Sequence, residues 1–201
     1  MNTENVLNRN LFLVKEHPGL LKAANNYDIL DPETGVILME CREERIGGLT
    51  RILRFTDLKR TTPFDIRIRT AGGAQILRMI RGVPVVASMV HVYDDTDTLI
   101  GTFRQKPFSI SGAFDVLDAE GKAVCKLKGG LTGWNFHFVA PDNLELAMVT
   151  KKWAGLGKEL FTSADNYVLT IDEIVPLDSL MRQLILASVL CIGLIQKIEI
   201  P

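Results

Sequence analysis

The sequence has few of the residues from which catalytic and metal sites are usually built. Its 201 residues include three histidines and three cysteines. These are His17, His91, His137, Cys41, Cys125 and Cys191. The histidines show no metal-ligand spacing and belong to no nucleophile motif. The odd number and wide spacing of the cysteines match neither a disulfide framework nor a zinc pattern. We therefore expect no enzymatic activity and no cofactor.

The chain also lacks a strong net charge and a targeting signal. The formal net charge is −1, so no global field attracts the protein to nucleic acid, and we expect no nucleic-acid partner. The first ten residues do not show the charged-then-apolar order of a secretory signal. Together with the cysteine pattern, this predicts a cytoplasmic location, with peripheral association at a membrane as one option.

No apolar run is long enough for a comfortable membrane span. The longest, Leu184–Ile195, contains one polar side chain, Ser188. Twelve helical residues rise about 18 Å, against a hydrocarbon core of roughly 30 Å. A helix that is apolar on all sides and too short to span is usually buried inside a protein. We expect burial in a folded core, with insertion in a bilayer as the alternative.

The middle of the chain repeats one pattern, in which two β-branched or aromatic runs flank a turn rich in Asp, Gly, Pro or Asn. This pattern is typical of β-hairpins. It occurs at residues 27–38, 64–77, 91–103, 114–125 and 136–149. Further strands are expected at Leu11–Lys15 and Tyr167–Ile171. So many strands indicate a sandwich or a closed barrel.

Two segments break this pattern. Residues 49–60 have the character of a short helix before Pro63, in which Leu49, Ile52 and Leu53 share a face. The second is the apolar C-terminal helix, introduced by Pro176 and capped by Asp178 or Ser179. We predict one mainly β domain over residues 1–201, with about 12 antiparallel strands closed into a barrel around this helix.

The basic residues are concentrated in one segment. Residues 42–81 contain ten Lys or Arg and four Asp or Glu, a net charge of +6. Period two puts Arg67 and Arg69 on the face opposite Ile66 and Ile68. Guanidinium groups are suited to binding phosphate, although arginine is also common on strand faces that are exposed to solvent.

Lys151 and Lys152 form a second basic group. The candidate phosphate-binding residues are Arg51, Arg54, Lys59, Arg60, Arg67, Arg69, Lys151 and Lys152.

One long motif of the chain is Lys151-Lys-Trp-Ala-Gly-Leu-Gly-Lys-Glu-Leu-Phe-Thr-Ser-Ala-Asp-Asn-Tyr167. It resembles the LURP-one-related and phospholipid scramblase families of the tubby-like superfamily, and it is the strongest of several matches. Weaker matches are Asn25-Asn-Tyr-Asp-Ile, Arg60-Thr-Thr-Pro-Phe-Asp-Ile and Pro176-Leu-Asp before the apolar helix. The resemblance extends from about Leu11 to Ile195 and implies a barrel of roughly twelve strands around a central C-terminal helix.

The resemblance also implies ligands. Tubby-like domains bind phosphoinositide headgroups, and animal scramblases have a proposed calcium loop. Where that loop begins with Asp, this chain has Ser163, and it keeps Asp165. Asp165, Asp172 and Asp178 are the calcium candidates, with Glu173 nearby, but these acids also suit ordinary turns and a helix cap. We expect a binding module for anionic phospholipid or phosphoinositide headgroups; the alternatives are lipid scrambling, or a protein-binding scaffold or stress-response role.

Overall fold

The structure is a computed structural model that describes residues 6–17, 24–44, 46–56, 62–83, 88–105, 114–129, 135–151 and 166–195. Within these ranges lie twelve strands and the helices α2 and α3, and Val6 and Leu7 are also helical. The strands are β1 (Leu11–Glu16), β2 (Tyr27–Leu30), β3 (Ile37–Glu43), β4 (Phe64–Thr70), β5 (Gln75–Arg81), β6 (Met89–Tyr93), β7 (Leu99–Gln105), β8 (Phe114–Asp118), β9 (Ala123–Gly129), β10 (Asn135–Val139), β11 (Glu145–Thr150) and β12 (Asn166–Ile171). The helices are α2 (Gly48–Leu53) and α3 (Leu180–Ile195).

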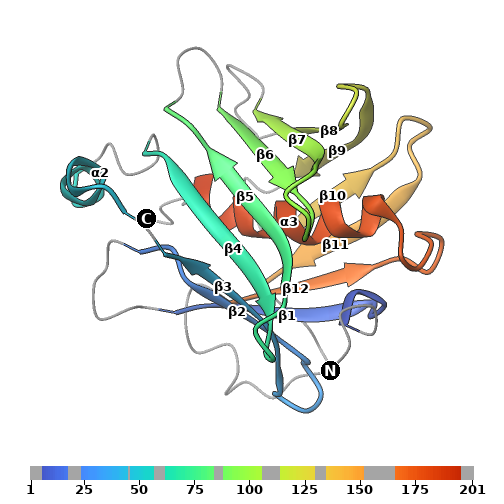
Figure 1. Ribbon diagram of the computed structural model, residues 1–201. Coiled ribbons are helices and arrows are strands. Elements are labelled where there is room, and N and C mark those ends of the chain that lie inside the picture. The colour runs from blue at the N-terminus through green and yellow to red at the C-terminus, as the bar shows by residue number, and fades with distance from the viewer. Residues whose placement is uncertain are drawn as a thin grey trace.

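The strands form one closed antiparallel barrel (Figure 1). The five predicted hairpins are confirmed as the pairs β2–β3, β4–β5, β6–β7, β8–β9 and β10–β11. The two further predicted strands close the barrel, because β1 pairs with both β12 and β2. The predicted fold class is therefore confirmed.

The antiparallel order gives the barrel two distinct ends. Each odd-numbered strand leads into its successor at one end, which we call the α2 end because α2 joins β3 to β4 there. Each even-numbered strand leads onward at the other end, where β12 passes into α3. The turns at this α3 entry end are short, and Asp31 shows how one is built: its Oδ1 accepts hydrogen bonds from the N–H groups of Glu33 and Thr34, at 2.8 and 3.1 Å.

Helix α3 runs through the barrel (Figure 1). Every residue from Leu184 to Ile192 is 3% exposed or less, and its apolar side chains form one core cluster with inward side chains of the strands. Ser188 donates its hydroxyl hydrogen to the carbonyls of Leu184 and Ile185, each at 2.9 Å. A polar side chain in this position is therefore satisfied within the helix itself.

The first turn of α3 contains a feature that the sequence did not indicate. Ser179, one of the two predicted caps, accepts a hydrogen bond from the Arg182 N–H at 3.4 Å. The Arg182 side chain is buried, and its guanidinium donates to the Arg9 carbonyl, Asn10 Oδ1 and the Val175 carbonyl. Burial lowers the pKa of this guanidinium, although Asp178 opposes the shift. Arg182 thus ties the start of α3 to the N-terminal segment.

Helix α2 is shorter than the helix predicted over residues 49–60. It ends at Leu53, and Arg54 forms the next turn. Of the residues predicted to share a face, Ile52 is 66% exposed and Leu53 is half-buried. Figure 1 shows α2 standing away from the barrel wall.

Candidate functional site

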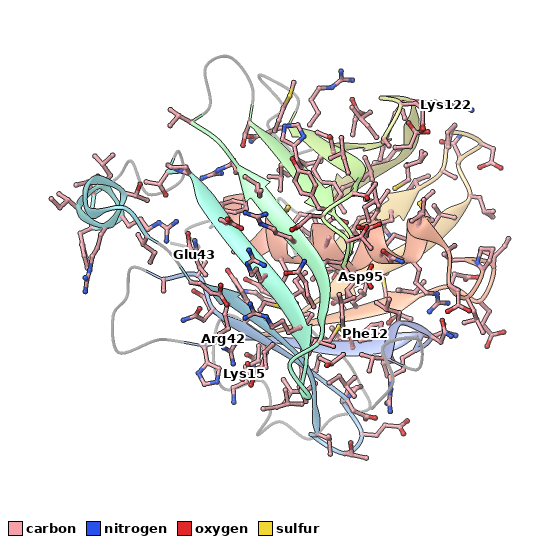
Figure 2. The ribbon with its side chains drawn as sticks, in the orientation of Figure 1. Phe12, Lys15, Arg42, Glu43, Asp95 and Lys122 are labelled. Atoms are coloured by element: carbon pink, nitrogen blue, oxygen red, sulfur yellow. The ribbon has the colours of Figure 1, made fainter. Side chains whose placement is uncertain are left out.

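The outer face of β3, β4 and β5 carries a row of arginines. The strand register places Arg42 opposite Arg67, and Arg67 opposite Arg78. Ile66 and Ile68 are fully buried on the other side of β4, so Arg67 and Arg69 lie on the outer face as predicted. We call Arg42, Arg67, Arg69 and Arg78 the arginine face. Figure 2 shows Arg42 on the side of the molecule opposite Lys122.

The positive charge of the arginine face is balanced by carboxylates. Arg42 contacts Asp28 at 2.6 Å, and Arg78 binds Asp65 through Nε and Nη2 at 2.9 and 2.7 Å. The bidentate bond to Asp65 raises the pKa of Arg78 above its ordinary value. The net charge of +6 counted along the sequence is therefore not presented on this face.

Arg67 and Arg69 differ from the other two arginines because they share one exposed acid. Both guanidinium groups contact Glu44, whose side chain is 44% exposed. Arg67 also donates to Gln75 Oε1 at 2.7 Å. Their own side chains are 30% and 31% exposed. Both therefore lie within reach of an anion at the surface.

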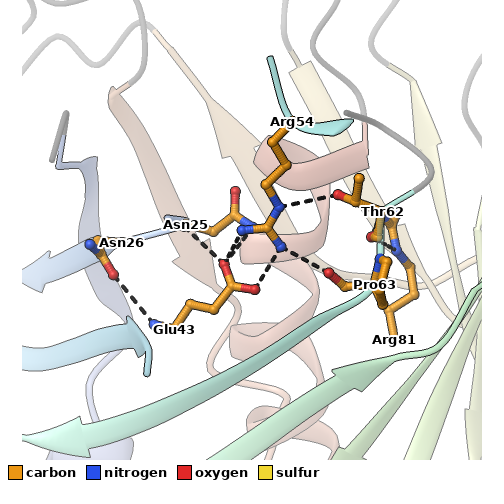
Figure 3. A network of polar contacts seen from close by, with 7 residues as sticks. All are labelled: Asn25, Asn26, Glu43, Arg54, Thr62, Pro63 and Arg81. Atoms are coloured by element: carbon orange, nitrogen blue, oxygen red, sulfur yellow. Dashed lines mark hydrogen bonds and ion pairs between the residues drawn. The ribbon is translucent and has the colours of Figure 1, made fainter. Parts of the chain in front are cut away.

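Arg54 does not belong to the exposed candidates. Its guanidinium binds Glu43 through Nη1 and Nη2 at 2.5 and 2.6 Å, and both side chains are 1% exposed. It also donates to Thr62 Oγ1 and the Pro63 carbonyl (Figure 3). The prediction that Arg54 contacts phosphate at the surface is corrected, because burial and the bidentate ion pair keep this side chain inside. We call the Arg54–Glu43 pair the clamp.

Other polar groups extend the clamp on both sides. Glu43 Oε2 accepts hydrogen bonds from the Asn25 backbone N–H at 3.1 Å and from Asn25 Nδ2 at 3.0 Å (Figure 3). The buried guanidinium of Arg81 donates to the Thr62 carbonyl and lies 4.9 Å from the centroid of the Phe64 ring. Burial lowers the pKa of Arg81. Arg81, which belongs to the basic segment, is therefore also unavailable at the surface.

The remaining basic candidates fall into two groups. Arg51 is exposed on α2, and Lys151 is half-buried with its ammonium 5.5 Å from the centroid of the Tyr167 ring. Lys59, Arg60 and Lys152 lie outside the described residues, as does most of the motif from Lys151 to Tyr167. The topology brings Arg51 and Lys151 to the same end of the barrel, the α2 end.

Of the three calcium candidates, the structure describes Asp172 and Asp178. Asp172 accepts a hydrogen bond from the Ile174 N–H at 2.9 Å in a turn, and Asp178 is an exposed turn residue with φ of 58°. Asp165 lies outside the described residues. Within the part of the chain that the structure describes, no three His, Cys, Asp or Glu side chains are grouped as metal ligands.

Sequence reasoning missed two features of this region. The clamp depends on where the connection from β3 to β4 places Arg54 relative to Glu43, and no local sequence pattern indicates that position. The exposure of Ile52 and Phe55, at 66% and 65%, had a weak signal: each follows an arginine directly in Arg51-Ile-Leu-Arg-Phe55. The described helices include none that is both long enough and apolar enough to span a bilayer.

The fold places the protein in the class of closed β-barrels with a buried C-terminal helix. This is the fold that the resemblance seen in the sequence implies. Residues 20–195 match the family model described as Scramblase. The chain therefore belongs to the scramblase family, which confirms the resemblance seen in the sequence and connects the chain to lipid-related, scramblase-type function. No solved structure gives a significant match to the chain.

Proposed function

We propose that this protein is a non-enzymatic binding module that recognises the phosphates of anionic phospholipid at a membrane surface. The observation that supports it best is the arginine face, where half-exposed guanidinium groups stand in register on adjacent strands. Guanidinium groups bind phosphate with two parallel hydrogen bonds. Membership of the scramblase family makes a lipid the most suitable source of these phosphates.

The existing ion pairs determine which arginines of the arginine face are available to bind phosphate. Arg42 is paired with Asp28, whose side chain is 5% exposed and which also contacts His17 Nε2 at 2.6 Å, so separating Arg42 would take one of two partners from a buried carboxylate. Arg67 and Arg69 share the exposed Glu44. Exposed ion pairs are worth about 0–1 kcal/mol, so phosphate displaces Glu44 at low cost. Each basic residue near an anionic surface contributes roughly 1 kcal/mol.

Reversal of these two charges tests the proposal. We expect R67E/R69E to weaken binding to mixed phosphatidylcholine and phosphatidylserine vesicles by about 30-fold at low salt, since two contributions of about 1 kcal/mol are lost. The measurement is the vesicle-bound fraction at increasing lipid concentration, with thermal unfolding to verify the fold.

The matched control is K126E/K128E. Lys126 and Lys128 are exposed on β9, and three strands separate β9 from β5. This variant changes the net charge by the same amount, so it should keep its binding to within a few-fold. An equal loss in both double variants would mean that net charge, and not the arginine face, determines binding.

Movement of lipid across the bilayer is the second candidate, because the family is named for it. A route through insertion of α3 would require residues Leu184–Ile192 to leave the core, where each is 3% exposed or less. It would also separate Arg182 from its three oxygen partners. These costs favour binding at the surface over insertion of this helix.

A further inference from the structure

In and just after α2, an arginine side chain is buried while two large apolar side chains are exposed. The Arg54 side chain is 1% exposed, whereas Ile52 and Phe55 are 66% and 65% exposed. Globular proteins normally bury large apolar side chains and leave arginine in water. Burial of apolar side chains among the described residues therefore does not account for the orientation of Ile52 and Phe55.

The clamp is what holds α2 in this orientation. Arg54 reaches inward to Glu43 at the end of β3 and to Thr62 and Pro63 just before β4 (Figure 3). Because Arg54 lies between Ile52 and Phe55 in the turn that follows the helix, fixing the arginine inward keeps both apolar side chains pointing outward. The barrel thus presents two apolar side chains on a fixed support.

The charge around these side chains suits an anionic lipid surface. The described residues 46–56 contain no acid, and Arg51 is exposed beside Ile52. Apolar and aromatic side chains next to a cation are typical of segments that lie in the membrane interface. The helix also joins β3 to β4, whose outer faces carry Arg42, Arg67 and Arg69. The apolar pair therefore lies on the connection between two strands of the arginine face.

We propose that α2 is the part of the protein that enters the bilayer. Ile52 and Phe55 insert at the boundary between headgroups and acyl chains, and Arg51 contacts a lipid phosphate. The proposal rests on the proposed function, in that both require a phospholipid surface. It adds an apolar contact that salt does not screen.

Removal of the apolar pair is the first test. We expect I52S/F55S to lower the partition coefficient onto mixed phosphatidylcholine and phosphatidylserine vesicles by at least about tenfold, and by the same factor at low and high salt. R67E/R69E should instead lower it mainly at low salt. The control is I174S/L177S, since Ile174 and Leu177 are 52% and 57% exposed at the α3 entry end and should leave partitioning unchanged.

A fluorescent label gives a second, direct readout. Cys41, Cys125 and Cys191 are buried, and burial raises the pKa of Cys125 to about 12 and also raises those of the other two thiols. F55C therefore introduces a single reactive thiol among the described residues. A polarity-sensitive dye at position 55 should shift to the blue on vesicles, whereas the same dye at L177C should not.

The outcomes separate the two proposals. If the wild type binds no vesicles, both are wrong. If it binds, but I52S/F55S binds equally well and the dye at position 55 reports water, insertion of α2 is wrong and the arginine face stands. A smaller mass in solution for I52S/F55S than for the wild type would show that a second copy of the chain covers α2. That result would also overturn insertion.

Discussion

At the scale of single residues, the clamp matters most because it buries two opposite charges, each on a side chain that is 1% exposed. Arg54 and Glu43 satisfy each other through two hydrogen bonds of 2.5 and 2.6 Å, and Thr62, Pro63 and Asn25 bind their remaining polar atoms. The sequence contained both charged residues but not their pairing, because eleven positions separate them and only the path of the chain through α2 brings them together.

Removal of one partner of the clamp should be more harmful than removal of both. We expect R54L to lower the free energy of unfolding by about 3–5 kcal/mol, because Glu43 remains buried without a counter-charge. The double variant R54L/E43L should recover part of that loss. Urea unfolding monitored by circular dichroism measures both values. A loss below about 1 kcal/mol in R54L would contradict the buried ion pair.

At the scale of elements, the strands were predictable and the contacts between elements were not. Each hairpin has its own turn residues and its own alternation, as in Phe64–Thr70, where buried and half-buried residues alternate along the whole strand. The contact of α3 with the barrel depends instead on the size of side chains that lie far from α3 in the sequence. Gly101 on β7 is such a position, because α3 passes directly over it.

A side chain at Gly101 should disturb this contact. A Cβ atom there would lie 2.5 Å from the Leu117 carbonyl oxygen and 2.7 Å from Leu184 Cδ2. We expect G101A to destabilise the protein by about 1–3 kcal/mol through overpacking. The matched control is G82A, since a Cβ at Gly82 meets no atom within 4 Å. Equal melting temperatures for G101A and the wild type would show that α3 does not pack closely on β7.

At the scale of the whole molecule, the distribution of charge differs from what the sequence alone indicated. The count of +6 over residues 42–81 is correct as arithmetic, but folding buries Arg54 and Arg81. It also brings in Asp28 and Asp97, which lie outside that window, to pair with Arg42 and Arg78. Acids on neighbouring strands and turns are not visible in a linear count. Arg67 and Arg69 remain as the pair whose predicted position and exposure agree with the structure.

The most direct test of the central claim is flotation of the wild-type protein with vesicles of phosphatidylcholine alone or mixed with phosphatidylserine, at low and high salt. Recognition of phosphates by the arginine face predicts binding to the anionic vesicles, little binding to the neutral ones, and weaker binding at high salt, because salt screens exposed charges. Equal binding to both kinds of vesicle, or no binding to either, would contradict it, and the second result would favour a protein as the partner.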